Sequence, residues 1–201
     1  MTDHSPSPKD VSHSGRSRIL DEAEALFRTR GGYNAVSMRD IACKVGIRQA
    51  SLYYHFPSKE QLFVAVTERM FERHRTGLQQ AIEQAGDDLK AQLDSVSGWF
   101  LSQPPMHFLS MIHMELPLLG EDNIKRLSVY SQECVFEPIR QLFAQAQERG
   151  EIRDDVRPKL LTGFFLSCIE SVPYVRSFPD TASSKAIVNE VISVLLDGIK
   201  P

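Results

Sequence analysis

Apolar residues recur every three or four positions along most of the chain from Arg16 onward. This spacing is typical of amphipathic helices, because it places the apolar side chains on one face. The first such segment carries Ile19, Leu20, Ala23, Leu26 and Phe27, and the glycines of "RGGY" (30–33) end it. No stretch alternates apolar and polar residues long enough to predict a strand. The pattern therefore predicts an all-α fold.

Two short helices are predicted next, joined by a single glycine. Ser37 opens the first of them, with Asp40 in the capping-box position, and Gly46 ends it. Its apolar stripe consists of Met38, Ile41, Ala42 and Val45. The second covers residues 48–56 and ends before Pro57, because a residue before proline is disfavoured in a helix. Such a pair predicts a helix-turn-helix, the motif that places its second helix in the DNA major groove.

The rest of the chain is also predicted to be helical, whereas residues 1–15, rich in Ser, Pro, His and charge, are expected to be disordered. Ser58 and Gln61 form a second capping-box pattern at the start of a long helix. Further helices are expected over residues 88–103, 105–115, 123–149, 157–177 and 183–199, between segments rich in Gly, Pro and Asp.

The stretch "LYYHF" (52–56) carries polar tips at several consecutive positions. Leu52 and Phe56 are expected to anchor the second short helix in the core, which leaves its other residues free for DNA. Side chains at its N-terminus can reach base edges; these are Arg48, Gln49, Ala50 and Ser51. Side chains further on can donate to phosphate oxygens; these are Tyr53, Tyr54, His55 and Lys59. The structural alternative for the two tyrosines is packing at a helix junction with wetted hydroxyls.

The distribution of charge agrees with a nucleic-acid partner for the N-terminal part. The chain has a net charge of −3, but residues 1–60 carry nine Lys or Arg and seven Asp or Glu, whereas the remainder carries fourteen and nineteen. Between Met38 and Lys59 there are four basic residues and one acidic residue. This small excess has the sign expected for a phosphate-binding segment.

Residues from Arg18 to Phe63 resemble the DNA-binding domain of the TetR family of transcriptional regulators. The resemblance lies in "A…LF…GGY…S…DIA…VG…LYYHF…K…L", in order and at the family's spacing. It implies a homodimeric regulator, expected to be a repressor, with a helix-turn-helix DNA-binding domain (16–60) and a helical ligand-binding and dimerisation domain (61–201). By the family's pattern the DNA contacts fall on Met38, Arg39, Arg48, Gln49, Ala50, Tyr53, Tyr54, His55 and Lys59; members vary at Met38 and Arg48.

The resemblance also implies three partners: double-stranded operator DNA, a second copy of the chain, and a small-molecule effector that releases the DNA. The last two helices would form the dimer seam, since both carry wide apolar stripes. A charge at Val191 or Leu195 is therefore expected to give a folded monomer. The alternative is that both stripes face the body of their own subunit.

The stretch "PPMHFLSMIHMELP" (104–117) has the composition of an adaptable apolar cavity wall. The expected ligand-binding residues are Trp99, Phe100, His107, Phe108, Met111, Glu115 and Phe165, with His107 and Glu115 orienting the ligand. The alternative for each is a plain core residue. A hydrophobic or aromatic effector is expected, and the acidic balance after residue 60 favours a neutral or cationic one. A soft metal site in this stretch is disfavoured, because His113 points away from His107 and no dense Cys/His spacing occurs.

Other classes of protein find less support. The chain contains no GxSxG, HExxH, P-loop or dinucleotide fingerprint, so neither an enzyme nor a cofactor is predicted. An alternative that the sequence does not exclude is a regulator that is controlled by a protein partner or that responds to no ligand. The three cysteines are far apart and form no CxxC pair, which favours a reducing compartment. With no apolar leader and no apolar run of membrane-spanning length, a cytoplasmic location is expected.

Overall fold

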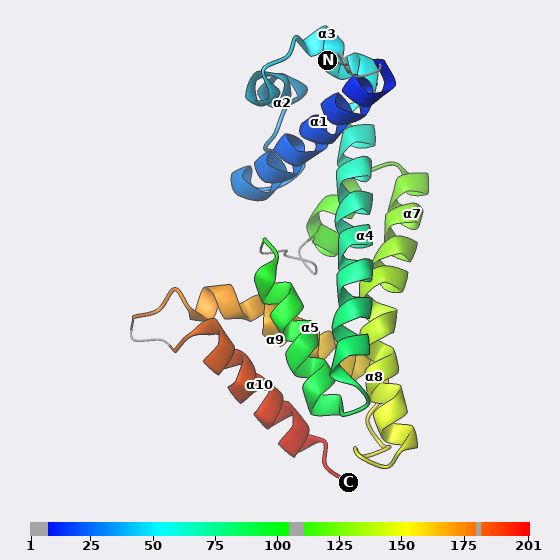
Figure 1. Ribbon diagram of the computed structural model, residues 1–201, viewed down its shortest axis with the longest axis vertical. Helices are drawn as coiled ribbons and strands as arrows, with labels where there is room; N and C mark the ends of the chain where they lie inside the picture. Colours follow the sequence, from blue (N-terminus) through cyan, green and yellow to red (C-terminus); the bar gives the residue numbers. More distant parts are fainter. Residues whose placement is uncertain (1–7, 105–110, 180–181) are drawn as a thin grey trace, which may run out of the picture. The chain divides into compact units, whose positions relative to one another are not determined.

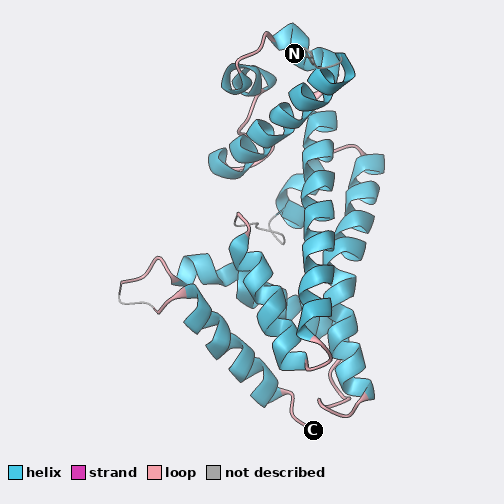
Figure 2. Ribbon diagram, viewed as in Figure 1, coloured by secondary structure: helices cyan, strands magenta, loops and turns pink. Residues whose placement is uncertain are grey.

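The computed structural model describes residues 8–104, 111–179 and 182–201. Over these ranges the chain consists of helices and loops without a strand (Figure 1 and Figure 2), which confirms the all-α prediction. The chain divides into two compact units. Unit 1 comprises Met1–Met70 and Glu115–Leu127, and unit 2 comprises Phe71–Met114 and Ser128–Pro201. The helices α4 (Lys59–Ala85) and α7 (Glu121–Ser131) supply residues to both.

Unit 1 contains α1 (Pro8–Arg30), α2 (Met38–Val45), α3 (Gln49–His55) and the first turns of α4. The predicted helix start at Arg16 is wrong, because α1 already begins at Pro8, inside the expected disordered tail. A proline is favourable at the first helical position, where no hydrogen-bond donor is needed. Residues 1–7 lie outside the described residues.

The start and the end of α2 follow the prediction. The Asp40 N–H donates to Ser37 Oγ at 3.1 Å, and the Ser37 N–H donates to Asp40 Oδ2 at 2.9 Å, so the capping box is complete. Gly46 has φ +77°, a left-handed conformation that few other residues adopt, and its N–H donates to the Ala42 carbonyl at 3.0 Å. The turn between α2 and α3 is thereby fixed by local chemistry.

The core of unit 1 is formed by the apolar stripes that the sequence shows. The five apolar residues of the α1 stripe are all buried, and the rings of Phe27 and Phe63 meet edge to face with centroids 5.1 Å apart. Leu52 and Phe56, the predicted anchors of α3, are 0% and 3% exposed. The face of α3 that points inward is therefore confirmed.

Residues 115–127 join unit 1 through polar contacts with the start of α4. The Glu60 carboxylate accepts the Gly120 N–H and the Asn123 side-chain amide, both at 2.7 Å. These hydrogen bonds, the Asn123 bond foremost, lower the pKa of Glu60. Arg126 also forms an ion pair with Glu68. The compact units therefore do not follow the predicted division at residue 60, because these long-range contacts leave no local sequence signal.

Unit 2 is built from α5 (Leu89–Ser102), α8 (Glu137–Glu148), α9 (Pro158–Val175), α10 (Ser184–Gly198) and the remainder of α4 and α7. The helix α8 packs on α5 and α9, and α10 packs on the same two helices. The predicted helix 123–149 is interrupted by a π-helical turn, η3 (Gln132–Phe136). Another π-helical turn, η1, covers Met111–Glu115, and a 3₁₀ turn, η2, covers Leu116–Leu118.

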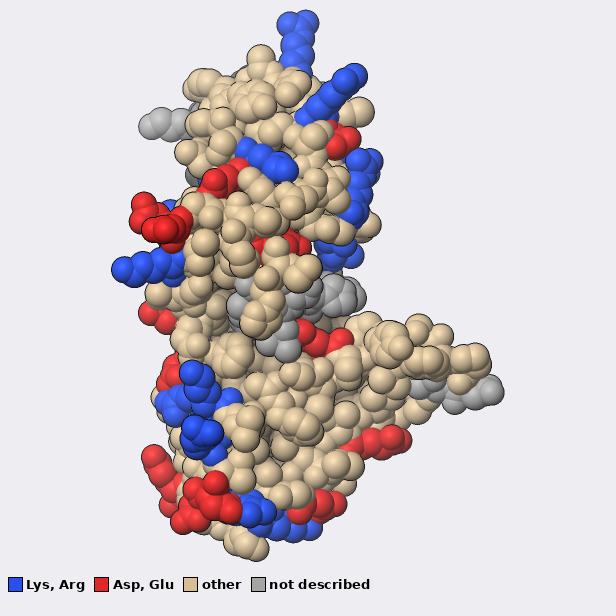
Figure 3. Space-filling model, turned by 180° about the vertical axis from the view of Figure 1, so that it is seen from behind, with Lys and Arg blue, Asp and Glu red and all other residues tan. Residues whose placement is uncertain are grey.

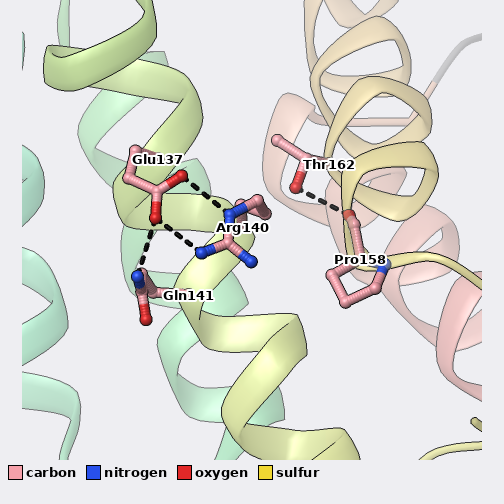
Figure 4. Close-up of polar contacts among 5 residues, drawn as sticks. All are labelled: Glu137, Arg140, Gln141, Pro158 and Thr162. Carbon is pink, nitrogen blue, oxygen red and sulfur yellow. Dashed lines mark hydrogen bonds and ion pairs between the residues drawn. The ribbon is translucent and has the colours of Figure 1, made fainter.

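Polar side chains in α8 and α9 are satisfied within their own helices (Figure 4). Glu137 accepts bonds from Arg140 Nε at 2.7 Å and Nη2 at 2.6 Å, and from Gln141 at 2.7 Å, and the Arg140 bonds above all lower its pKa to about 2. The hydroxyl of buried Thr162 donates to the Pro158 carbonyl at 2.9 Å. Among the helices described, none is both long and apolar enough to cross a membrane.

Candidate nucleic-acid interface and effector cavity

The outward face of α3 presents the side chains that the sequence assigns to DNA. Arg48 is the N-cap residue, and Gln49, Ala50 and Ser51 are exposed on the first turn. Tyr54 is 86% exposed, which excludes packing at a helix junction for this ring in the isolated chain. An apolar ring so exposed on a short helix is available to a partner surface.

The other aromatic residues of α3 are arranged around Tyr54. Tyr53 is 44% exposed, and the half-buried His55 ring meets the Tyr54 ring edge to face, with centroids 5.5 Å apart. This contact restricts the directions in which the His55 and Tyr54 tips can point. The tips are therefore partly preorganised before any partner binds.

Two of the DNA-contact residues expected from the family pattern are used inside unit 1. Met38 is 6% exposed and belongs to the buried stripe of α2, so its side chain is a core residue and leaves the set of DNA contacts. Lys59 is half-buried; its Nζ donates to the Tyr33 carbonyl at 3.0 Å and lies 4.1 Å from the Tyr33 ring centroid. Arg39, by contrast, is exposed.

The sequence interpretation missed two arginines on α1 beside the turn and the end of α3. The Arg16 guanidinium lies 4.8 Å from the Phe56 ring centroid, and Arg18 Nη2 donates to the Val45 carbonyl at 3.2 Å. Their signal was the basic run "RSR" directly before the apolar stripe. At the top of the view in Figure 3, Lys and Arg side chains project from the surface of unit 1, with a few acidic side chains between them.

Glu115, which the sequence places in the ligand site, belongs to unit 1 instead. Its carboxylate lies against the turn after α1, where a Cβ on Gly32 would overlap it, and the backbone of Tyr33 hydrogen-bonds it. Burial raises the pKa of this half-buried carboxyl. Gly32 has φ +91°, so both its conformation and its close neighbour require glycine.

A cavity of about 350 Å³ lies within unit 2. Its apolar wall is supplied by α5, η3 and α9, and its polar groups are His74, Gln103, Glu170, Arg176, Ser177 and Ser184. This volume is at the lower end of small-molecule sites, which span roughly 300–1,000 Å³. The arrangement, apolar with a few polar groups, suits a small organic ligand.

His74 is the most deeply buried polar group of this lining, with 1% exposure. The Trp99 indole N–H donates to its Nδ1 at 3.2 Å, so in the neutral ring the hydrogen is on Nε2. The His74 ring also lies 5.4 Å from the Phe100 ring centroid. His74 sits on the inner side of α4, where the sequence gives no sign that separates it from a core residue.

The predicted ligand-binding residues are scattered. Phe100 lines the cavity, whereas Trp99 is not part of the lining and hydrogen-bonds to His74, which is. Met111 is 7% exposed and Phe165 is fully buried against Phe143; neither lines the cavity, so both are core residues, the alternative that the sequence left open. His107 and Phe108 lie outside the described residues. No cluster of metal-ligating side chains occurs in the described part of the chain.

Comparisons with known proteins identify the family. Residues 19–66 match the model described as "Bacterial regulatory proteins, tetR family". The nucleoid occlusion factor SlmA of Marinobacter nauticus is 31% identical over 151 residues, which cover 73% of this chain and 73% of that protein. The chain belongs to the TetR family. The resemblance seen in the sequence is thereby confirmed, and the family is one of regulators rather than enzymes.

One further relative and one solved structure are also similar to this chain. The HTH-type transcriptional repressor KstR of Rhodococcus jostii is 47% identical over 58 residues, 29% of this chain and 27% of that protein. The matched region thus spans much less than two thirds of that repressor. The crystal structure of AibR in complex with isovaleryl coenzyme A and operator DNA has a TM-score of 0.74 at 21% identity, covering 90% of this chain and 98% of that one, which shows a shared fold.

Proposed function

We propose that this protein is a sequence-specific DNA-binding transcriptional regulator, a repressor, which a small molecule releases from its operator. The proposal rests on the surface of α3. Leu52 and Phe56 fix this helix in the core, and its polar and aromatic side chains on the opposite face are exposed. Membership of the TetR family and the match to the repressor KstR support it. A site of action in the cytoplasm goes with this role.

The side chains of α3 divide into two roles. The Gln49 amide can pair with an adenine edge in the major groove and so read sequence. Tyr53, Tyr54 and His55 can donate to phosphate oxygens, which carry no sequence information. Residues whose positions suit further phosphate or base contacts are Arg16, Arg39, Arg48, Ala50 and Ser51. Lys59 can join them, because its ammonium keeps further N–H donors beside its bond to the Tyr33 carbonyl.

Gel-shift titrations on operator and random DNA test these roles. Tyr54→Phe and His55→Ala should weaken binding to both DNAs by a similar factor, whereas Gln49→Ala should lower the preference for operator over random DNA. Arg157→Gln, an exposed change in unit 2, is the matched control. Parent-like binding by both phosphate variants would refute the assignment of these tips.

The proposed regulator acts as a two-fold dimer through α9 and α10. These helices expose large apolar side chains: Leu160 (61%), Phe164 (51%), Tyr174 (68%) and Val194 (71%). Exposed apolar patches of this kind mark interaction surfaces, and an isologous contact would bury the same patch on both subunits. Leu195, one of the two residues that the sequence pointed to, is 4% exposed and packs inside its own subunit, so Val194 is the better probe.

The cavity of unit 2 is the proposed effector site. The ligand must bind the released conformation more tightly than the DNA-bound one, since equal affinity shifts no equilibrium. The DNA-bound dimer should present its two α3 helices one helical turn apart, about 34 Å. The structure of AibR with both a coenzyme A ester and operator DNA supports ligand control within this fold.

A further inference from the structure

The mouth of the cavity differs in chemistry from its interior. The interior wall is apolar, with Val135, Leu166, Ile169 and Val172 at most 6% exposed. The mouth lies where α9 ends and α10 begins, and it carries Arg176, Ser177 and Ser184. A ligand that fills this space needs an apolar body and a polar end.

The polar groups of the mouth are hydrogen-bond donors. Arg176 Nη1 donates to Ser184 Oγ at 3.2 Å, which holds the guanidinium at the mouth. A hydroxyl that accepts a bond keeps its own hydrogen to donate, and the guanidinium keeps further N–H groups. With no described carboxylate paired to Arg176, both side chains can donate to one ligand group.

The charged residues of the lining indicate which polar group the ligand carries at the mouth. Arg176 is the one Lys or Arg in the described lining, and Glu170, its one carboxylate, already has an interaction of its own. His74 accepts the Trp99 indole N–H at Nδ1, so this nitrogen presents no N–H to a ligand. A single cation with a neighbouring hydroxyl complements a singly charged acceptor, whereas a phosphate dianion calls for more than one cation.

We propose that the effector is a small apolar monocarboxylic acid. Its carboxylate accepts from Arg176 and Ser184, and its hydrocarbon body lies along Leu166, Ile169 and Val172. The inference deepens the proposed function and rests on the effector cavity described there. It replaces the expectation of a neutral or cationic ligand, which was drawn from the net charge of the whole body, because charges that line a site decide more than distant surface charges.

Three probes with one hydrocarbon chain test the head group: octanoate, 1-octanol and octylamine. Calorimetric titration of the full chain at fixed ionic strength gives the affinities, and the fluorescence of Trp99, the one tryptophan, gives a second readout through its bond to His74. Octanoate should bind about ten-fold more tightly than 1-octanol, and octylamine more weakly than either. Shortening the acid should lower its affinity about four-fold per methylene.

Variants at the mouth assign the effect to Arg176. Arg176→Gln should remove the advantage of octanoate over 1-octanol, Arg176→Lys should keep part of it, and Arg157→Gln at the other end of α9 should leave it unchanged. Equal binding of octanoate and 1-octanol by the parent would overturn the inference. So would an unchanged octanoate affinity in Arg176→Gln, or no binding of any probe at millimolar concentration.

One more variant separates this inference from the proposed effector site. Leu101 is half-buried in the cavity lining, and Leu101→Trp places bulk in the space that both octanoate and 1-octanol would fill. If 1-octanol matches octanoate and Leu101→Trp blocks both, the cavity stands and the acid is wrong. If octanoate binds equally well to folded Leu101→Trp, verified by circular dichroism, then the ligand lies elsewhere and both proposals fail.

Discussion

Gly77 in α4 leaves room for the Trp99 indole of α5 to pack directly against the α4 backbone. A Cβ atom at this position would lie closer than 3.0 Å to three carbons of the Trp99 indole on α5. The indole cannot turn away freely, because its N–H donates to His74 Nδ1. Gly77→Ala should therefore disturb both the helix contact and the deepest polar group of the cavity.

The expected change in the free energy of unfolding of Gly77→Ala is the sum of one stabilising and two destabilising contributions. Alanine in place of glycine stabilises a helix interior by about 1 kcal/mol. Forcing a methyl group into a filled contact costs about 1–3 kcal/mol, and losing the Trp99 bond to His74 costs about 1 kcal/mol. The free energy of unfolding should fall by about 1–3 kcal/mol. The matched change Gly98→Ala, with no atom within 4 Å of the new methyl, should raise it by up to about 1 kcal/mol.

Urea unfolding followed by far-ultraviolet circular dichroism measures both variants, at one protein concentration because a dimer couples stability to concentration. Gly77→Ala should also shift the native fluorescence of Trp99, whereas Gly98→Ala should leave it nearly unchanged. Adding Trp99→Phe should reduce the penalty of Gly77→Ala, since residues in contact are not additive. Equal stability of the two glycine variants would refute this account of the contact.

Three further perturbations have defined outcomes. Val194→Glu should give a monomer in sedimentation with native helix content and no operator binding, whereas Leu195→Glu, at a buried site, should unfold the chain. Glu137→Gln should cost about 0.5–1 kcal/mol at pH 7, since the pair is partly exposed. With a folded pKa of about 2 against 4.5 unfolded, that difference should shrink as the pH falls from 4.5 to 2. Glu60→Ala should lower the stability of unit 1 by about 1–2 kcal/mol in hydrogen exchange, as two donors lose their acceptor.

The helix-turn-helix formed by α2 and α3 could be predicted because the residues that determine it are close together in the sequence. The capping box of Ser37 and Asp40, the left-handed Gly46 and the anchors Leu52 and Phe56 each act within a few residues of chain. Met38 shows the limit of a family pattern. Its apolar character and its place on the α2 stripe predicted burial, and burial is what the structure has.

The cavity could not be predicted because its lining comes from residues far apart in the chain. His74 lies on α4, Val135 on η3, and Arg176 and Ser184 on either side of the α9–α10 connection. Each follows the same helical pattern as a core or surface residue, so periodicity cannot select it. The unusual composition of the Met-rich stretch 104–117 led to the prediction that Glu115 binds the ligand. In the structure Glu115 belongs to unit 1.

The proposed dimer changes what the effector must supply. Moving a two-state equilibrium from 1:99 to 99:1 needs about a 10⁴-fold preference for one state. A small acid in a cavity of about 350 Å³ has few atoms with which to build so large a preference. Two cavities that bias the same symmetric equilibrium multiply their effects, so about a 100-fold preference per site, roughly 2.7 kcal/mol, is sufficient. One charge-assisted contact at Arg176, made better in the released state, is of that order. A ligand this simple can therefore control the operator only if both subunits respond together.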